Sequence, residues 1–467
     1  MKKTCKHTDV SVPQSVTEFI KLATGQEAIQ IGFTDQQVSA HAGLATFAGF
    51  LHWHRLGRLL AGWLPHVRTS PKAIRPADLA LGFVVGILAG AKKLGQVAYL
   101  RRDALLPPLL AIERIGSQSS FTRFFQGFTG AGQNLRSFRP VWQWCADRLR
   151  SRPGGYTLDL DSTHLLHEDG HQEGVRTAPT PQGFKRSLHP LLAMIAEAGL
   201  VAGFWLRPGN TVCDNNVVAF TLDLLAHLPR QVHLRLVRAD SGFCHGPWLD
   251  LLESQHLDYI VVARLYRPVQ RLLKKEMLWQ PSEVPGTEVA ELIHQEAGWR
   301  TARRLILIRH RIAEKARPTG KRLIDCPGYA YQALVTSRPE HVRPIAVWRD
   351  YNGRAGSENV IKELDGHFGL PDLCLKKFWS TEAALSLAVL AYNLCVLFQR
   401  HLGWLEQVRA STLRFRLFTT GGILSRRGGV TTVRLSVPAN ERTWWQRLFE
   451  KLISPYPNGN AVSPWPG

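Results

Sequence analysis

A short run of the sequence, residues 351–362, places four chemically different side chains at helical spacing. They are an aromatic, a cation, a carboxylate and a second cation: Tyr351, Arg354, Glu358 and Lys362. Residues three, four or seven apart share one face of an α-helix, so these side chains are predicted to form a single stripe. A carboxylate flanked by cations suits a site that binds a metal ion and a phosphate group together.

Two further segments end in aspartate and have the composition of β-strands. Residues 157–161 carry Asp159 and Asp161, and residues 236–240 end in Asp240. Side chains two apart on a strand point to the same face, so Asp159 and Asp161 are both candidates. Aspartate is also a common turn former at strand ends. The combination with the helix of Glu358 is what predicts a nuclease or strand-transferase site, in which carboxylates converge on divalent cations.

The elements that position these residues alternate from residue 155 onward, after the breaker cluster Ser-Arg-Pro-Gly-Gly at residues 151–155. Strands are predicted at residues 156–161, 188–196, 200–206, 233–239 and 259–263, and helices at residues 215–227 and 247–255. The turn at residues 198–199 predicts a hairpin. The pattern therefore predicts an α/β (α+β) fold, with a mixed sheet and helices packed against it.

Composition divides the chain into five predicted regions. Residues 303–310 and 329–336 are strand-like within a polar stretch, residues 380–402 form a long apolar helix, and residues 430–437 form a last strand. The first predicted region, residues 1–150, is helical and DNA-binding, with helices at 36–51 (N-cap Asp35), 76–93 and 121–128. The other four regions are the first part of the core at 155–265, a β-rich insertion at 266–343, the second part of the core at 344–402 and a tail at 403–467.

The overall charge favours a polyanionic partner. The 467 residues hold 58 Lys and Arg against 37 Asp and Glu, a formal charge of +21. Cations that neutralise phosphates release condensed counterions, which favours binding to nucleic acid. The apolar stretches at residues 79–91 and 383–398 are shorter than the roughly 20 residues of a membrane-spanning helix, so we interpret them as buried helices without membrane contact.

The seven cysteines and the N-terminal residues favour a reduced compartment. The cysteine count is odd and no Cys-x-x-Cys is present, which argues against a disulfide framework. The basic start is followed by polar residues 8–15 and not by an apolar core, so no signal peptide is predicted. We expect a cytoplasmic protein. His164, His167 and His171 invite a zinc interpretation, but they lack cysteine partners and lie in a polar segment.

Taken in order, the acidic segments resemble the three motifs of DDE transposases of the insertion-sequence group four superfamily. The motifs are Asp161-Ser-Thr, Arg238-Ala-Asp240-Ser-Gly-Phe and Tyr351-x2-Arg354-x3-Glu358. Supporting phrases are most similar to the thirteen-eighty branch of that superfamily: His171-Gln-Glu-Gly174, Leu206-Arg-Pro-Gly-Asn210 and Asn359-Val-Ile-Lys362-Glu-Leu. The resemblance extends over roughly residues 155–400.

This resemblance implies an RNase H-like catalytic core with a β subdomain inserted between the second aspartate and the glutamate. It implies that Asp161, Asp240 and Glu358 hold two Mg²⁺ ions, for which Mn²⁺ can substitute. Asp161 is preferred as the first ligand because a small polar residue and threonine follow it, and Asp159 remains the alternative. Tyr351, Arg354 and Lys362 are the implied contacts to the transposon end.

The implied activity is DNA transposition: Mg²⁺-dependent cleavage at the transposon ends followed by strand transfer into target DNA. The implied partners are double-stranded DNA, as terminal inverted repeats and target, and a second copy of the chain in a synaptic complex, in the bacterial cytoplasm at the nucleoid. One residue departs from the family pattern. A lysine is expected seven residues after Glu358, and Asp365 stands there. A nuclease without strand transfer and an impaired DNA-binding relic therefore remain alternatives.

Overall fold

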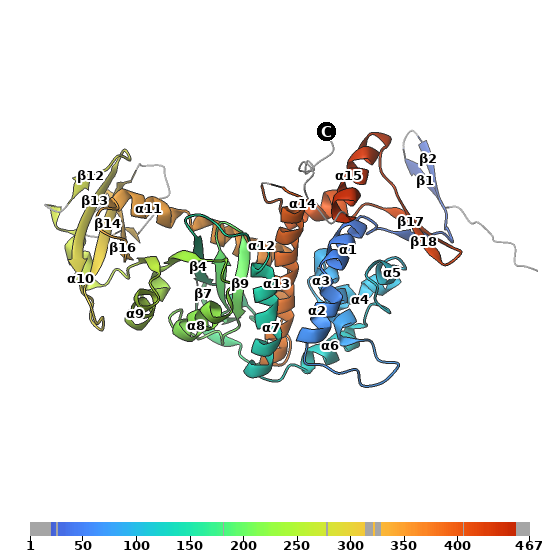
Figure 1. Cartoon of the computed structure of the whole chain (residues 1–467), viewed down its shortest axis with the longest axis horizontal. Helices are drawn as coiled ribbons and strands as arrows, with labels where there is room; N and C mark the ends of the chain where they lie inside the picture. The colour runs from blue at the N-terminus through green and yellow to red at the C-terminus, as the bar shows by residue number, and fades with distance from the viewer. Residues whose placement is uncertain are drawn as a thin grey trace, which may run out of the picture.

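The computed structural model describes residues 20–24, 27–180, 182–276, 279–312, 321–322, 328–404 and 406–453. Figure 1 shows an elongated molecule with a β-rich end, a central sheet and a helical end. The long helix α13 (Phe378–His401) stands between the central sheet and the helical end. The predicted absence of a signal peptide concerns N-terminal residues that lie outside this description.

The central sheet contains the order expected of an RNase H-like core. Its first strand, β4 (Tyr156–Ser162), pairs antiparallel with β8 (Leu191–Ile195), and β8 pairs antiparallel with β9 (Leu200–Trp205). On its other side β4 pairs parallel with β10 (Leu234–Ala239), and β10 pairs parallel with β11 (Asp258–Val262). Each parallel connection needs a crossover. The predicted RNase H-like mixed sheet and the hairpin between β8 and β9 are confirmed.

Helices separate the parallel strands, as the alternating pattern predicted. The connection from β9 to β10 contains α8 (Val217–His227), and the connection from β10 to β11 contains α9 (Gly246–Ser254). Helix α8 begins where Val217, Phe220 and Leu224 start an apolar repeat that is buried. A three-stranded antiparallel sheet lies after β4 and consists of β5 (Leu165–Leu166), β6 (Arg176–Thr180) and β7 (Gly183–Leu188).

The insertion continues the central sheet. Strand β16 (Tyr329–Thr336) pairs antiparallel with β11, in a register that sets Ile260 opposite Thr336. Strands β14 (Arg303–Arg311), β13 (Thr287–His294) and β12 (Gln280–Pro281) then extend the sheet outward, and β15 (Lys321–Arg322) pairs with β16. Helix α10 (Arg267–Leu273) precedes them. Residues 266–343 are therefore β-rich, as predicted, and share hydrogen bonds with the core.

Both ends of the chain contribute to the helical end of the molecule. Strand β17 (Gly422–Arg427) pairs with β3 (Gln37–Ser39), and α15 (Arg442–Ile453) packs on α1 (Leu44–Trp53). The other elements of this end are β1 (Ile20–Thr24), β2 (Glu27–Ile31), α2 (Leu56–Trp63), α3 (Pro76–Leu88), α4 (Leu94–Tyr99), α5 (Leu106–Leu109), α6 (Gln118–Gln126), α14 (Ala410–Leu413), a π-helical turn (Arg414–Phe418) and β18 (Val430–Leu435). Helix α7 (Ala131–Ala146) packs between β9 and α13 (Figure 1).

One N-terminal prediction is wrong. Residues 36–51 do not form one helix capped by Asp35, because residues 37–39 pair as β3 with a strand almost 400 residues later and α1 begins only at Leu44. Pairing with β17 satisfies the backbone of this polar segment and outweighs its helical pattern. The second predicted helix begins at Pro76 as expected but ends at Leu88, and the third is α6.

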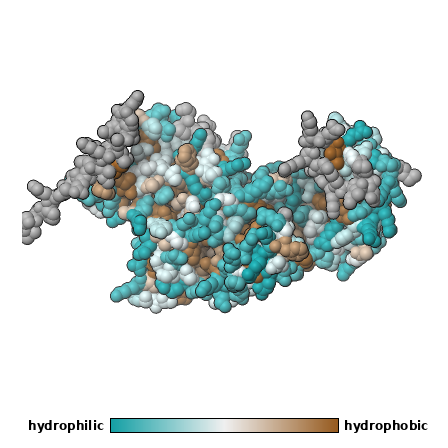
Figure 2. All heavy atoms as spheres, turned by 180° about the vertical axis from the view of Figure 1, so that it is seen from behind, coloured by the Kyte–Doolittle hydropathy of each residue, from teal (hydrophilic) through white to brown (hydrophobic). Residues whose placement is uncertain are grey.

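The surface and the apolar helices agree with a folded protein. Hydrophilic side chains cover most of the face in Figure 2, and hydrophobic ones are scattered among them. Helix α13 is long and apolar enough to cross a membrane, but its apolar window is completely buried inside the protein. The prediction that both apolar stretches form buried helices is confirmed. Within the described residues the cysteines at positions 145, 213, 244, 374 and 395 are free; Cys5 and Cys326 lie outside them.

Candidate active site

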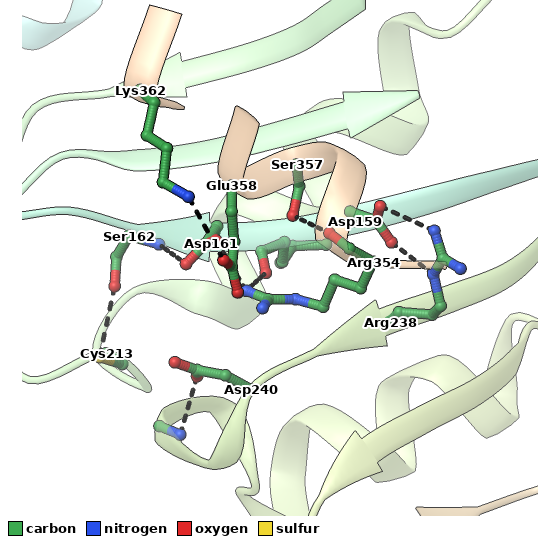
Figure 3. A network of polar contacts seen from close by, with 12 residues as sticks. Asp159, Asp161, Ser162, Cys213, Arg238, Asp240, Arg354, Ser357, Glu358 and Lys362 are labelled. Carbon is green, nitrogen blue, oxygen red and sulfur yellow. Dashed lines mark hydrogen bonds and ion pairs between the residues drawn. The ribbon is translucent and has the colours of Figure 1, made fainter. Parts of the chain in front are cut away.

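Asp161 lies at the carboxyl end of β4, where the strand leaves the sheet. Its Oδ2 forms an ion pair with Nη2 of Arg354 at 2.8 Å, and its Oδ1 accepts a hydrogen bond from the backbone N–H of Ser162 at 2.8 Å. The same Arg354 nitrogen donates to the carbonyl of Leu160 at 3.2 Å. Asp161 is only 8% exposed and Arg354 only 7%. The carboxylate is therefore fixed in position before any ligand arrives (Figure 3).

The carboxylate of Asp159, the alternative first ligand, is already bound by an arginine. It is 1% exposed, and its two oxygens accept bonds from Nε and Nη2 of Arg238 at 2.6 and 2.8 Å. This bidentate pair occupies both carboxylate oxygens. Burial raises the pKa of Asp159, while the Arg238 guanidinium opposes that shift. The geometry therefore favours Asp161 as the ligand and gives Asp159 a structural role.

Arg238 also connects the sheet to the helix of Glu358. Its Nη1 donates to the carbonyl of Asp350 at 2.5 Å. A Cβ atom on Gly353 would lie 2.6 Å from this nitrogen, so only glycine leaves room for the guanidinium. The motif arginine thus holds β4 and the chain just before α12 (Ala355–His367) in a fixed relation. This role of Arg238 was not predicted.

Asp240 follows β10 and begins a short turn. Its Oδ1 accepts from the N–H of Gly242 at 2.9 Å. Arg264 holds this turn in place, because it donates to the carbonyls of Ser241 and Gly242 at 3.0 and 2.9 Å. The same guanidinium pairs with Asp214 at 3.0 Å. Arg264 is therefore a positioning residue for Asp240, and its isolated place after β11 gave no signal in the sequence.

The predicted stripe is divided between two helices. Tyr351 belongs to α11 (Pro344–Asn352), and Glu358 and Lys362 belong to α12. The prediction of one continuous helix is wrong in this detail, although Gly353 and Arg354 keep right-handed helical dihedral angles and preserve the direction of the chain. Glu358 and Lys362 have side chains 58% and 73% exposed and lie 4.0 Å apart.

The three predicted basic and aromatic neighbours of the site differ in access. Arg354 is buried against Asp161, and Lys362 is exposed. Tyr351 is half-buried, and burial raises the pKa of its hydroxyl to about 12. Of the predicted DNA contacts, Lys362 is therefore the one whose charge already faces solvent, while Arg354 is engaged with the carboxylate.

The three carboxylates affect one another electrostatically. Burial raises the pKa of Asp161 to about 6; the Arg354 charge opposes this, and the charges of Asp240 and Glu358 add to it. All-oxygen donors of this kind are what Mg²⁺ prefers, and a cation among them would relieve their repulsion. Within the described residues no three His, Cys, Asp or Glu side chains lie close enough to form a preassembled metal cluster. The residues fit a divalent cation by donor chemistry and charge.

His164 and the buried His189 lie together near the residue that follows Asp161. His164 stacks on His189 with ring centroids 4.1 Å apart, and its Nδ1 lies 3.0 Å from Oγ of Ser187. Burial lowers the pKa of His189 to about 4, so its ring is neutral at pH 7. Its Nδ1 then donates to the carbonyl of Thr211 at 2.6 Å, and its Nε2 accepts from the hydroxyl of Ser162 at 3.0 Å. His189 thereby supports the residue after Asp161, and no zinc site among these histidines is found in the described residues.

The shorter motifs at residues 171–174 and 206–210 contain residues that hold the surrounding scaffold together. Glu173 accepts from the N–H of Phe378 at 3.3 Å, at the start of α13. Gly174 has φ +85°, and a Cβ there would meet the Phe378 ring at 2.4 Å. Arg207 is 1% exposed and donates to the carbonyls of His189 and of residues 212, 213 and 215. These residues hold the loops that surround the carboxylates.

Asp365 occupies the position where the resemblance leads one to expect lysine. Its Oδ1 is buried without a hydrogen-bond partner, and burial alone raises its pKa to about 6. Lys362, one turn earlier, is on the exposed side of α12. The family's lysine position is thus half-buried in this chain, and Lys362 is the cation that α12 presents to solvent beside Glu358.

Asp365→Asn is expected to stabilise the protein at pH 8 by about 1–3 kcal/mol. A raised carboxyl pKa means that the folded state binds more protons than the unfolded state between about pH 4 and 6. The wild-type residue therefore costs stability above pH 6, and that cost disappears below pH 4. Urea unfolding at pH 8 and pH 4 measures the difference; Asp169→Asn, an exposed aspartate, is the control. An equal gain at both pH values would contradict the prediction.

A cryo-EM structure of a piggyBac transposase synaptic complex with hairpin DNA is similar over 93% of this chain and 91% of that chain, at 14% identity and a TM-score of 0.41. No curated protein sequence matches significantly. The family described as transposase DDE domain group 1 matches residues 22–455. Since this match covers nearly the whole chain, the protein belongs to the DDE transposase family.

Proposed function

We propose that this transposase moves an insertion sequence by metal-dependent cleavage of its DNA ends and transfer of the freed strands into target DNA. What supports the proposal is the placement of Asp161, Asp240 and Glu358 on two neighbouring parallel strands and one helix, within electrostatic reach of one another, with Arg354 ion-paired to the first. The acidic motifs and supporting phrases favour the group four superfamily and its thirteen-eighty branch.

In this proposal Asp161, Asp240 and Glu358 hold Mg²⁺ or Mn²⁺. The chemistry that such ions supply when bound is activation of a water nucleophile and stabilisation of the leaving oxygen. Arg354 keeps Asp161 oriented and partly offsets the effect of burial on its ionisation. Lys362 is placed to neutralise charge on the phosphate as water adds to phosphorus and the bond to the 3′ oxygen breaks.

The freed 3′-hydroxyl then attacks a phosphodiester of target DNA, with no covalent enzyme intermediate. The proposed partners are the terminal inverted repeats, the target duplex and a second copy of the chain that brings two ends together. We propose that this takes place in the bacterial cytoplasm, at the nucleoid. The charge of +21 supports a DNA partner.

The test is a cleavage and joining assay with the full chain, a duplex carrying the inverted repeats that flank its gene, and a supercoiled target plasmid. With Mg²⁺ we expect nicked ends and end-joined plasmid, and with EDTA neither product. Cut ends without joined plasmid would identify a nuclease without strand transfer. Binding without cutting in either metal would identify an impaired relic. Both outcomes contradict the proposal.

A further inference from the structure

A groove of about 1010 Å³ runs beside the helix that carries Glu358. One wall is α12, through Gly356, Asn359 and Glu363, and another is the C-terminal half of α13 from Tyr392 onward. Further lining comes from the turn between β8 and β9, the segment after α7, the residues that follow α13 and the end of α15. The groove therefore lies where the catalytic core meets the helical end of the molecule.

The groove concentrates positive charge. Its lining includes five Lys or Arg side chains and two histidines: Arg148, Arg150, Arg400, Arg409, Lys451, His54 and His401. The lining also includes three carboxylates, but each has another partner. Asp159 binds Arg238, Glu197 accepts from Thr157, and Glu363 accepts from the N–H of Ala410. The hydrogen bonds leave Glu197 and Glu363 charged, and Glu363 feels the charge of Arg409. Five Lys and Arg against these two carboxylates still give the lining a net positive charge.

Two of the arginines are buried at a cost, because burial lowers the pKa of Arg148 and of Arg400. Burial, with the charges of Arg148 and His401, lowers the pKa of His54 to about 4, so this ring adds no charge to the groove at pH 7. Nε of Arg148 and Nε2 of His401 are buried without a hydrogen-bond partner. Cations held together in this way favour an anion that would pair with them.

The dimensions favour a polymer. Pockets for small ligands occupy about 300–1,000 Å³, and this groove is at or above the upper end of that range. Lining residues follow α13 from Tyr392 to His401, a helical length of roughly 14 Å. Phosphates of one DNA strand advance about 3.4 Å each along the duplex axis and lie farther apart along the strand itself, so this wall is long enough for more than one phosphate.

We infer that this groove binds the sugar-phosphate backbone of DNA, next to the active site and independently of base sequence. The inference rests on the proposed DNA-processing function for the identity of the anion. Arg150 and Arg409 are exposed at the groove and supply phosphate contacts that can be removed without disturbing the fold.

The experiment measures how salt weakens binding of the full chain to a labelled 40-base-pair duplex of random sequence, in EDTA. For Arg150→Gln/Arg409→Gln we expect the slope of log K against log salt to become shallower by about 1.8, since each phosphate contact contributes about 0.9. The matched control is Arg267→Gln/Arg271→Gln, which removes the same charge from exposed positions on α10. We expect the control slope to stay within about 0.5 of wild type.

An unchanged slope in the groove variant, or an equal change in the control, overturns the inference. Inorganic phosphate provides a second arm: if it stabilises wild type against unfolding but not the variant, while the DNA slope is unchanged, the groove is a site for free phosphate only. Because binding is measured without metal, the result does not depend on cleavage. A transposition assay that fails would contradict the proposed function and leave the groove result standing.

Discussion

Asp161→Asn is expected to reduce cleavage of a transposon-end duplex by at least about a thousandfold, equivalent to roughly 4 kcal/mol in the activation barrier. The amide keeps the shape of the side chain but loses the negative charge that would hold a divalent cation. Asp240→Asn and Glu358→Gln are expected to have effects of the same order. Single-turnover cleavage with Mg²⁺, measured beside DNA binding by fluorescence anisotropy, separates loss of chemistry from loss of binding.

Asp169→Asn is the control for this series, because Asp169 is exposed and lies outside the carboxylate group. DNA affinity of the three site variants in EDTA should remain within about threefold of wild type, since each loses an acid and not a cation. If Asp240→Asn bound the ends normally and cut as well as wild type, the assignment of the site would be wrong. If Asp161→Asn alone retained cutting, the first ligand would have to be sought elsewhere on β4.

Asp159→Asn is expected to lower the free energy of unfolding by about 3–5 kcal/mol, because it leaves the buried Arg238 guanidinium without its carboxylate. The side chains of Asp159 and Arg238 are 1% and 7% exposed, so water cannot replace the lost partner. Urea unfolding at pH 7 measures the effect. A loss below about 1 kcal/mol would show that the pair is not held as described.

The double variant Asp159→Leu/Arg238→Met provides the matched comparison. Replacing both members of a buried pair by apolar residues is often neutral for stability, so we expect it to recover most of the loss. Cleavage is expected to remain low in the same protein, because Arg238 no longer binds the carbonyl of Asp350 ahead of α12. Recovery of both stability and cleavage would mean that Arg238 does not position the helix of Glu358.

The local patterns of the sequence predicted the core well. Five strands and two helices around Asp161 and Asp240 were found within a few residues, since their apolar runs are separated by clear turns. The hairpin turn at Gly199 has φ +64°, a conformation that favours glycine. The three acidic candidates were proposed from strand ends, helical spacing and the resemblance to transposase motifs. The structure brings them into mutual electrostatic reach, and their role as metal ligands stays a prediction.

What the sequence did not reveal depends on contacts between distant residues. The pairing of β3 with β17 joins segments almost 400 residues apart, and the polar residues 36–39 resemble a helix start when considered alone. Arg264 looked like an ordinary basic residue, and the motif that contains Arg238 gave no structural role for it. Their roles arise from carbonyls and carboxylates that only the folded chain brings to them, as does the space for Arg238 beside Gly353.

The continuation of the core sheet into the insertion has a consequence for synthesis of the chain. Until residues 329–336 have left the ribosome and formed β16, only one side of β11 is paired, with β10. The backbone N–H and C=O groups on its other side have no strand partner. Such an unpaired edge is a template for association with other chains. A protein truncated before β16, or one lacking residues 266–343, would retain that edge permanently and be prone to aggregate, whatever the state of its carboxylates.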